Sequence, residues 1–236
     1  MSLSRPLVRL PVRVVVVSLL LAGGLSGCGV AGTSFHPGVA AQVGDDTITV
    51  RKVDSIARNY CSAIEKQLVD NNQVLPRSYL RGGITGQLTL VEAARQLAQE
   101  EGVEPGADYT RRVSDLRDAV ATLPEEQADA VIEIDSSAAY LSSVLGAVGT
   151  KLLAERGQKN PSPAAAGEAG QQALARWIDD HDVQIDPEYG VAIQDGKAVP
   201  VDGSVSYAVG EAARKGSAAS PDQEYAASLP HSHRCG

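Results

Sequence analysis

Aromatic side chains are scarce in this sequence. Of its 236 residues, one is phenylalanine and one is tryptophan, and aromatic residues make up 4% of the chain. A core must therefore be built from leucine, valine, isoleucine and alanine. Hydrophobic residues nevertheless reach 43% and charged residues 21%. This balance is typical of a globular protein and excludes general disorder.

An excess of positive charge is also missing. The formal net charge is −8, so the sequence lacks the basic footprint of a nucleic-acid-binding protein. It contains no G-x-S-x-G or S-x-x-K motif, which excludes two common arrangements of a hydrolase nucleophile. Adjacent carboxylates such as Glu125 and Glu126 are expected to be solvated. We therefore predict no catalytic residue and no cofactor.

The first residues have the order of an export signal. Arg5, Arg9 and Arg13 precede an apolar run, Val14–Ala22, which is too short to span a bilayer of about 30 Å. The L-S-G-C that follows, ending at Cys28, resembles the lipobox of bacterial lipoproteins. In that family the cysteine receives a diacylglyceryl group and the signal peptide is cleaved just before it.

The resemblance implies a lipoprotein of the cell envelope, held outside the cytoplasm by lipid on Cys28. It implies a signal peptide over residues 1–27 and a tether over residues 28–37. Cleavage leaves 18 basic and 29 acidic side chains, a net charge of −11, which anionic lipids repel. The acyl chains would then supply the anchoring. The alternative is an ordinary cleaved signal, with Cys28 in a disulfide.

Hydrophobic periodicity predicts a hairpin followed by helices. Val39–Val50 forms two short strands around Gly44–Asp46, and Thr49 caps the next helix. Gly82, Gly83 and Gly86 weaken the start of the second helix, so we expect a kink or loop there. The five expected helices cover Val53–Leu68, Leu80–Ala98, Tyr109–Leu123 after a cap at Asp108, Val131–Leu152 and Ala164–Asp180.

The C-terminal part is expected to return as strands. Because Asp179, Asp180 and Asp182 oppose the helix dipole, we expect the fifth helix to end early. Strands are expected at Val183–Ile185, Tyr189–Ile193 and Lys197–Val201, with a turn at Asp195–Gly196, then a weak helix at Ser204–Lys215 and a polar tail over 216–236. The prediction is a mainly helical α+β fold over 38–215; that its small antiparallel sheet joins the N-terminal hairpin to C-terminal strands is implied by the family resemblance described next.

Two motifs resemble the N-terminal module of SurA-like periplasmic chaperones. The sequence V-G-D-D-T-I-T-V-R-K-V-D at Val43–Asp54 matches that family's opening strands and first helix. The sequence V-Q-I-D-P-E-Y-G at Val183–Gly190 matches its late returning strand. The family often carries a parvulin-type prolyl isomerase domain between these parts. Here only Gly157–Pro163 and one helix fill that place, so we predict no isomerase activity.

Few other residues suggest chemistry. Cys61 and Cys235 remain once Cys28 is lipidated, and in an exported protein they most simply form a disulfide. The alternative is a buried thiol and a free thiol. His231, His233 and Cys235 spell H-x-H-x-C, and the acids around His181 (Asp179, Asp180, Asp182 and Asp186) suggest a cation. Neither group has a complete ligand set, so we predict no metal. Trp177 is expected in the core or, alternatively, along a client groove.

Two function classes remain. The first is a membrane-tethered, ATP-independent holdase that binds unfolded or nascent exported proteins without catalysis. The second is an accessory lipoprotein that binds one dedicated envelope protein. The sequence lacks the methionine-rich or aromatic surface common at promiscuous sites, and the two classes differ in the breadth of their clients.

Overall fold

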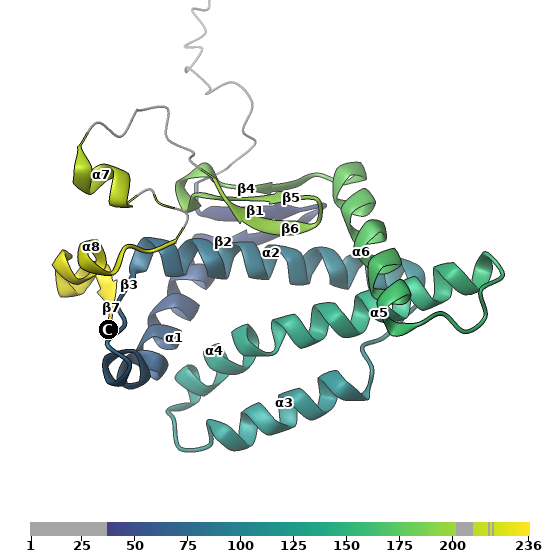
Figure 1. The fold of residues 1–236 in the computed structure, drawn as a ribbon, viewed down its shortest axis with the longest axis horizontal. Helices are drawn as coiled ribbons and strands as arrows, with labels where there is room; N and C mark the ends of the chain where they lie inside the picture. Colours follow the sequence, from purple (N-terminus) through teal and green to yellow (C-terminus); the bar gives the residue numbers. More distant parts are fainter. Residues whose placement is uncertain (1–36, 202–209, 217, 219) are drawn as a thin grey trace, which may run out of the picture. The chain divides into compact units, whose positions relative to one another are not determined.

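The computed structural model describes residues 37–201, 210–216, 218 and 220–236. It is mainly helical with small antiparallel sheets, which confirms the predicted fold class (Figure 1). The signal segment, most of the tether and residues 202–209 lie outside the described residues. The longer helices are α1 (Val50–Asp70), α2 (Arg77–Glu101), α3 (Ala107–Ala119), α4 (Glu125–Asp135), α5 (Ser137–Glu155) and α6 (Pro163–Asp180).

On one side of α2 lie β1, β2, β4, β5 and β6, and on the other lie α3, α4 and α5, while β3 and β7 lie by its N-terminal end (Figure 1). One sheet has the order β2-β1-β4, so the N-terminal hairpin pairs with a C-terminal strand as predicted. A separate hairpin joins β5 to β6, and β3 pairs with β7. The strands are β1 (Val39–Val43), β2 (Asp46–Thr49), β3 (Leu75–Pro76), β4 (Val183–Ile185), β5 (Val191–Gln194), β6 (Lys197–Pro200) and β7 (Arg234–Cys235).

Local chemistry explains the first elements. Gly44 has φ = 57° in the turn between β1 and β2, a conformation that glycine adopts without a Cβ penalty. The Thr49 side chain accepts a hydrogen bond of 3.1 Å from the Lys52 backbone N–H and caps α1. The cap satisfies a backbone donor that has no partner within the helix. These contacts confirm the sequence interpretation of the hairpin and the first cap.

Helix α2 contains neither a kink nor a loop at its glycines; this expectation was wrong. The helix runs without a break from Arg77 to Glu101. A Cβ on Gly82 would lie 2.5 Å from the Tyr189 carbonyl oxygen, and one on Gly86 would lie 2.7 Å from the Ala198 Cβ. The glycines therefore permit close approach of the C-terminal chain, and that packing offsets their low helix propensity.

Two other helix boundaries differ from expectation. The helix expected over Val131–Leu152 is divided at Ser136 into α4 and α5. Helix α6 continues to Asp180 instead of ending early. Trp177 near its end is buried and stacks on His181, with ring centroids 3.9 Å apart. This packing holds the last turn, while the acids of that turn are exposed to water.

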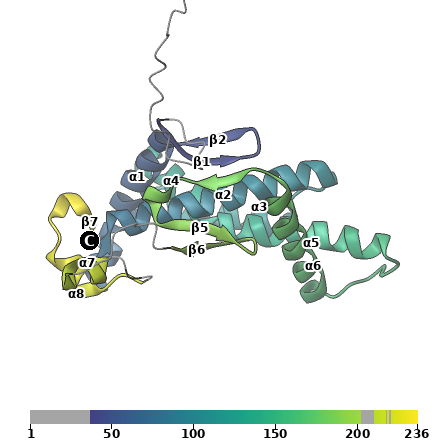
Figure 2. The ribbon, with the colours of Figure 1, turned by 90° about the horizontal axis from the view of Figure 1, so that it is seen from above.

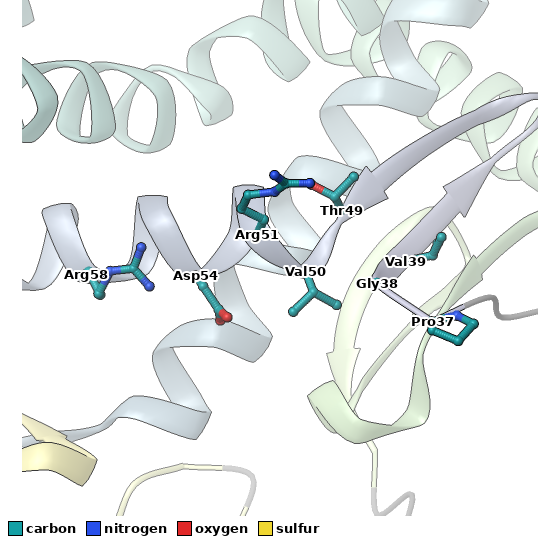
Figure 3. A pocket seen from close by; sticks show the side chains of 8 residues that line it. All are labelled: Pro37, Gly38, Val39, Thr49, Val50, Arg51, Asp54 and Arg58. Atoms are coloured by element: carbon teal, nitrogen blue, oxygen red, sulfur yellow. The ribbon is translucent and has the colours of Figure 1, made fainter.

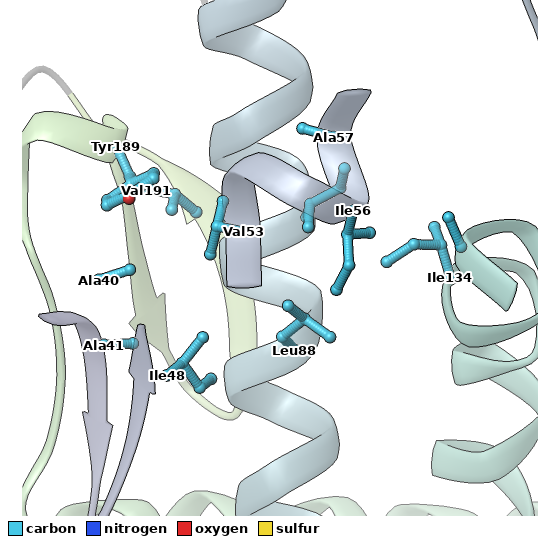
Figure 4. Packing of buried hydrophobic residues seen from close by; sticks show 12 residues of the cluster. Ala40, Ala41, Ile48, Val53, Ile56, Ala57, Leu88, Ile134, Tyr189 and Val191 are labelled. Atoms are coloured by element: carbon cyan, nitrogen blue, oxygen red, sulfur yellow. The ribbon is translucent and has the colours of Figure 1, made fainter. Parts of the chain in front are cut away.

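Two larger clusters of buried residues form the core. The first lies between the strands, α1, α2 and α4, where Ile48, Val53, Leu88 and Ile134 meet (Figure 4). The second joins the C-terminal half of α2 to α5 and α6, around Val144, Val148, Leu174 and Trp177. Leucine, valine, isoleucine and alanine dominate both clusters, as the composition predicts.

Among the residues that the structure describes, one long helical stretch meets the length and composition requirements of a membrane span. It covers Glu125–Glu155, which includes α4 and α5. Helix α5 packs against both α6 and α2, so its apolar face contributes to the second core cluster.

The C-terminal residues are packed against the domain. The short helices α7 (Glu211–Gly216) and α8 (Gln223–Ser228) contact each other, and α8 also contacts β3. The last strand, β7, pairs with β3. The part expected as a polar tail therefore contains secondary structure that is bound to the rest of the fold.

Candidate functional site: a groove along α2

A groove of about 990 Å³ lies along one face of α2. Its floor includes Tyr79, Gly83, Gln87 and Leu90, which are spaced by three or four residues and so share one helix face. The lining reaches from Pro76 to Leu90 along the chain. At a rise of about 1.5 Å per residue this is roughly 21 Å, the length of about six residues of an extended peptide.

Three parts of the chain surround this floor. On one flank lie β5, β6 and the short 3₁₀ helix η1 (Pro187–Tyr189). The start of α5 contributes Ala138 and Leu141. The C-terminal segment contributes Lys215, Gly216, Ala218 and Pro221. Most of the lining side chains are apolar, with glycine backbone and a few polar groups between them.

Glycines on α2 determine the shape of the groove. Gly82 and Gly86 bring η1, β5 and β6 close to the helix, whereas a Cβ on Gly83 would meet no atom within 4 Å. Gly83 lines the groove. Gly82 and Gly86 thus allow close packing against η1 and the hairpin, and Gly83 between them leaves space above the groove floor because it has no side chain.

An ion-pair cluster fixes η1 at one end of the groove. The Arg81 Nε donates to the Asp54 carboxylate at 2.8 Å, and its Nη2 lies 3.5 Å from the Glu188 carboxylate. The same guanidinium lies 5.0 Å from the centre of the Tyr189 ring, an arrangement that favours a cation–π contact. Burial raises the pKa of the Tyr189 phenol, which therefore stays protonated at neutral pH.

The other end of the hairpin is held by α6. The Gln171 side-chain amide donates to the Gly196 carbonyl oxygen at 2.9 Å. Both residues line the groove. The wall formed by β5 and β6 is therefore fixed at its turn as well as along α2.

The cysteines hold the C-terminal wall. Cys61 on α1 and Cys235 on β7 lie at disulfide distance, with their Cα atoms 5.6 Å apart. Both are buried. Two further hydrogen bonds join this segment to the start of α2 and the residues before it, from the Val74 N–H to the Gln223 side chain and from the Arg77 Nε to the Arg234 carbonyl oxygen. The disulfide predicted from the sequence thus lies beside the groove.

A second pocket of about 540 Å³ lies where the described chain begins (Figure 3). Its lining includes Arg51, Asp54 and Arg58 from α1 and Pro37 and Gly38 before β1. The Asp54 carboxylate already binds Arg81. This pocket is smaller, and one of its charged side chains is already paired, so we assign the candidate site to the groove along α2.

The other residues singled out from the sequence have local roles. Cys28 lies outside the described residues. His231 lies 3.4 Å from the Arg234 guanidinium, and the Asp186 carboxylate accepts a hydrogen bond from the Glu188 N–H. Within the described ranges, no three His, Cys, Asp or Glu residues are grouped as a metal site. Trp177 lies in the core, where its Nε1–H donates to Glu100 at 2.9 Å.

Comparison with known proteins assigns the chain to no family. No protein-family model matches the chain, and no curated protein and no solved structure matches it significantly. The function is therefore inferred from the geometry of the groove.

Sequence reasoning missed most of the groove. Tyr79, Gly83, Gln87 and Leu90 carry no motif, and their i, i+4, i+8, i+11 spacing is also typical of a buried face. The available signal was the glycine triplet on a helix that otherwise has a regular apolar pattern. Glycines within such a helix can be explained by close backbone approach, which the structure shows at Gly82 and Gly86.

Proposed function

We propose that the protein is an ATP-independent holdase for unfolded or nascent exported polypeptides, tethered to the membrane by lipid on Cys28. The observation that carries the proposal is the groove along α2. It is long enough for about six extended residues, it is mainly apolar, and it is open to a passing chain. These properties suit a short apolar segment of an unfolded polypeptide.

The chemistry of the lining favours weak, reversible binding. The floor offers one aromatic side chain at its outer end, Tyr79, which is 42% exposed. Most of the remaining lining consists of small aliphatic side chains, prolines and glycine backbone, with a few polar side chains such as Gln87 and Lys197. A short segment that buries little area and loses its own conformational freedom binds with modest affinity, and modest affinity lets a client leave and fold.

The resemblance of Val43–Asp54 and Val183–Gly190 to SurA-like chaperones supports the same proposal. The N-terminal hairpin and the returning strand β4 pair in one sheet, which is the arrangement expected from the resemblance. We propose no catalytic step, and we expect the protein to leave the rate of prolyl isomerisation in a tetrapeptide at background.

The proposal is tested by photo-crosslinking from the groove in cells. A photoreactive amino acid replaces Tyr79 in the full chain, and adducts are identified by mass spectrometry. The matched control places the same probe at Val69, which is 58% exposed on α1 and outside the groove lining. A holdase gives adducts with many unrelated exported proteins at position 79 and few at position 69.

Two other outcomes would contradict the proposal. One stoichiometric adduct at position 79 would identify an accessory lipoprotein with a dedicated envelope partner. Equal adducts at both positions would show that the groove does not bind polypeptide. A Cys28→Ala variant tests the tether separately, because loss of the lipid site should release the protein from membranes in a fractionation experiment.

A further inference from the structure

The hairpin of β5 and β6 has a defined hydrogen-bonding register. Its turn residues Asp195 and Gly196 have φ = 51° and 68°, as in a two-residue turn with both central residues left-handed. In such a hairpin the residues that flank the turn form a hydrogen-bonded pair, and every second residue pair after it is hydrogen-bonded as well. The Val201 N–H accordingly donates to the Gly190 carbonyl oxygen at 3.0 Å.

The same register turns other backbone groups away from β5. Ala198 and Pro200 occupy the non-hydrogen-bonded pairs, opposite Ile193 and Val191. Their peptide groups therefore point toward the outer edge of β6. That edge offers the N–H and C=O of Ala198 and the C=O of Pro200, since proline has no N–H.

Within the part of the chain that the structure describes, no strand pairs with this outer edge. Figure 2 shows β6 outermost among the strands that lie over α2. Lys197, Ala198 and Pro200 line the groove, so the free edge of β6 borders it. An unpaired strand edge of this kind is a template for another extended chain.

Side-chain alternation gives the groove two different faces. The Ala198 side chain faces α2, because its Cβ lies 2.7 Å from where a Cβ on Gly86 would be. Neighbouring Lys197 points to the opposite face of the hairpin, since successive side chains in a strand alternate. A chain paired with β6 would likewise place alternate side chains toward α2 and toward Lys197.

The uncompensated charge at the groove is positive, although the protein is acidic. Lys215 is paired with Glu211 and Glu224, at 3.4 and 3.2 Å, and Glu188 with Arg81. Lys197 is exposed and takes part in no ion pair among the described residues. A carboxylate on the bound chain would therefore meet an unpaired ammonium group.

We propose that the groove binds its polypeptide as an added β-strand on the free edge of β6, with an acidic side chain beside Lys197. The bound chain exchanges two hydrogen bonds with Ala198 and donates one to the Pro200 carbonyl oxygen. Apolar side chains face α2, and the intervening positions carry the acid. This inference rests on the proposed function and specifies the conformation and charge of the client.

Hydrogen exchange at one amide tests the strand. The full chain is mixed with reduced, carboxymethylated α-lactalbumin, a permanently unfolded and acidic probe, and exchange is read by mass spectrometry with fragmentation to single residues. The Ala198 N–H has no partner among the described residues and should exchange quickly when free. Strand addition should slow its exchange at least tenfold, while the Val199 N–H, already paired with β5, changes little.

Two substitutions on the edge have opposite expected effects. Pro200→Ala supplies the missing outward N–H, and one further hydrogen bond should tighten binding of the probe by about twofold to tenfold. Ala198→Pro removes the outward donor and places a ring on the edge, which should weaken binding at least about tenfold. Lys197→Gln should weaken binding by about twofold to fivefold, and less at high salt.

The outcomes separate the two proposals. Protection of Ala198 together with tighter binding by Pro200→Ala supports strand addition. Crosslinks at position 79 without protection of Ala198, and without any gain from Pro200→Ala, overturn strand addition but leave the holdase. Absence of probe binding and of position-79 crosslinks overturns both. Because Pro200→Ala adds a hydrogen bond and removes none, the test does not depend on whether the Ala198→Pro variant folds.

Discussion

Glycines create close contacts at two places in this protein, with different results. Between α5 and α6, a Cβ on Gly149 would lie 1.8 Å from the Ala166 carbonyl oxygen, and one on Gly170 would lie 1.9 Å from the Leu145 carbonyl oxygen. Between α2 and the β5–β6 hairpin, Gly86 makes a looser approach and Gly83 makes none. The first contact is closed, and the second leaves a groove.

The difference shows how the same residue type can serve stability or binding. Two helices that meet through reciprocal glycines bring their backbones together along their length, and α5 and α6 make the most extensive helix contact in the described protein. A helix that meets a narrow two-stranded hairpin is covered only where the hairpin lies. The uncovered flank of α2, with Gly83 on it, becomes the floor of the groove.

The largest expected effect comes from the disulfide that holds the C-terminal wall. Its cysteines are 174 residues apart, and opening such a loop in the unfolded state should cost about 4 kcal/mol of stability. A Cys61→Ala, Cys235→Ala double variant should therefore melt well below the wild type in a thermal scan. Equal melting temperatures would show that β7 is held by its hydrogen bonds and packing alone.

The closed contact should be the next most sensitive. Gly149→Ala places a methyl group against the α6 backbone, which has no flexible side chain to move aside, so we expect a loss of about 3 kcal/mol. Gly146→Ala is the matched control on the same helix, because its Cβ would meet nothing within 4 Å. The control should gain up to about 1 kcal/mol from helix propensity. Chemical denaturation measures the free energy of unfolding of both variants. Similar changes in the two variants would contradict a close backbone contact at Gly149.

Sequence reasoning succeeded for parts of the structure other than these two glycine contacts. Features that depend on neighbours in the chain were predictable, such as the Thr49 cap, the Gly44 turn and the Asp195–Gly196 turn. Apolar periodicity predicted the helices, and alternation predicted the short strands, whereas their pairing across both ends of the chain was implied by the family resemblance. Each of these signals lies within a few residues, so it needs no knowledge of the rest of the fold.

Features that depend on distant packing were not predictable. Gly82 and Gly86 were interpreted as a helix break, since propensity alone disfavours glycine; the carbonyl of Tyr189 and the side chain of Ala198 that require them lie more than 100 residues away. The end of α6 was misplaced because the stacking of Trp177 on His181 outweighs the local charges. The groove combines such distant contacts, so its lining could not be read from any single segment.

The open contact should tolerate substitutions unequally. Gly86→Ala would press on Ala198 and Val191, side chains of a hairpin that can shift, and we expect a loss of about 1 to 2 kcal/mol. Gly83→Ala meets nothing within 4 Å and should gain up to about 1 kcal/mol. Urea unfolding of both variants measures the difference. Equal and large losses would mean that the hairpin covers both positions.

The smallest expected effect concerns an ion pair on α2, which lies beyond the part of the helix that lines the groove. Glu92 accepts hydrogen bonds from Arg95 and, at 2.9 Å, from Gln96, and Arg95 also binds Asp46 at 3.1 Å. The hydrogen bond from Arg95 is the main cause that lowers the pKa of Glu92 below its ordinary value of 4.5. Because the carboxyl binds its proton more weakly in the folded protein, its contribution to stability is present above pH 4.5 and is lost as the pH falls through the lowered value.

A Glu92→Gln variant removes this dependence. Its free energy of unfolding, measured by urea titration at several pH values, should lie below that of the wild type at neutral pH and converge with it in acid. Glu104→Gln removes one charge at an exposed site with no ion pair among the described residues, so it separates loss of charge from loss of the ion pair. The stability curves of the Glu92→Gln variant and the wild type could instead stay parallel into acid. In that case the ion pair does not stabilise the contact of β1 and β2 with α2.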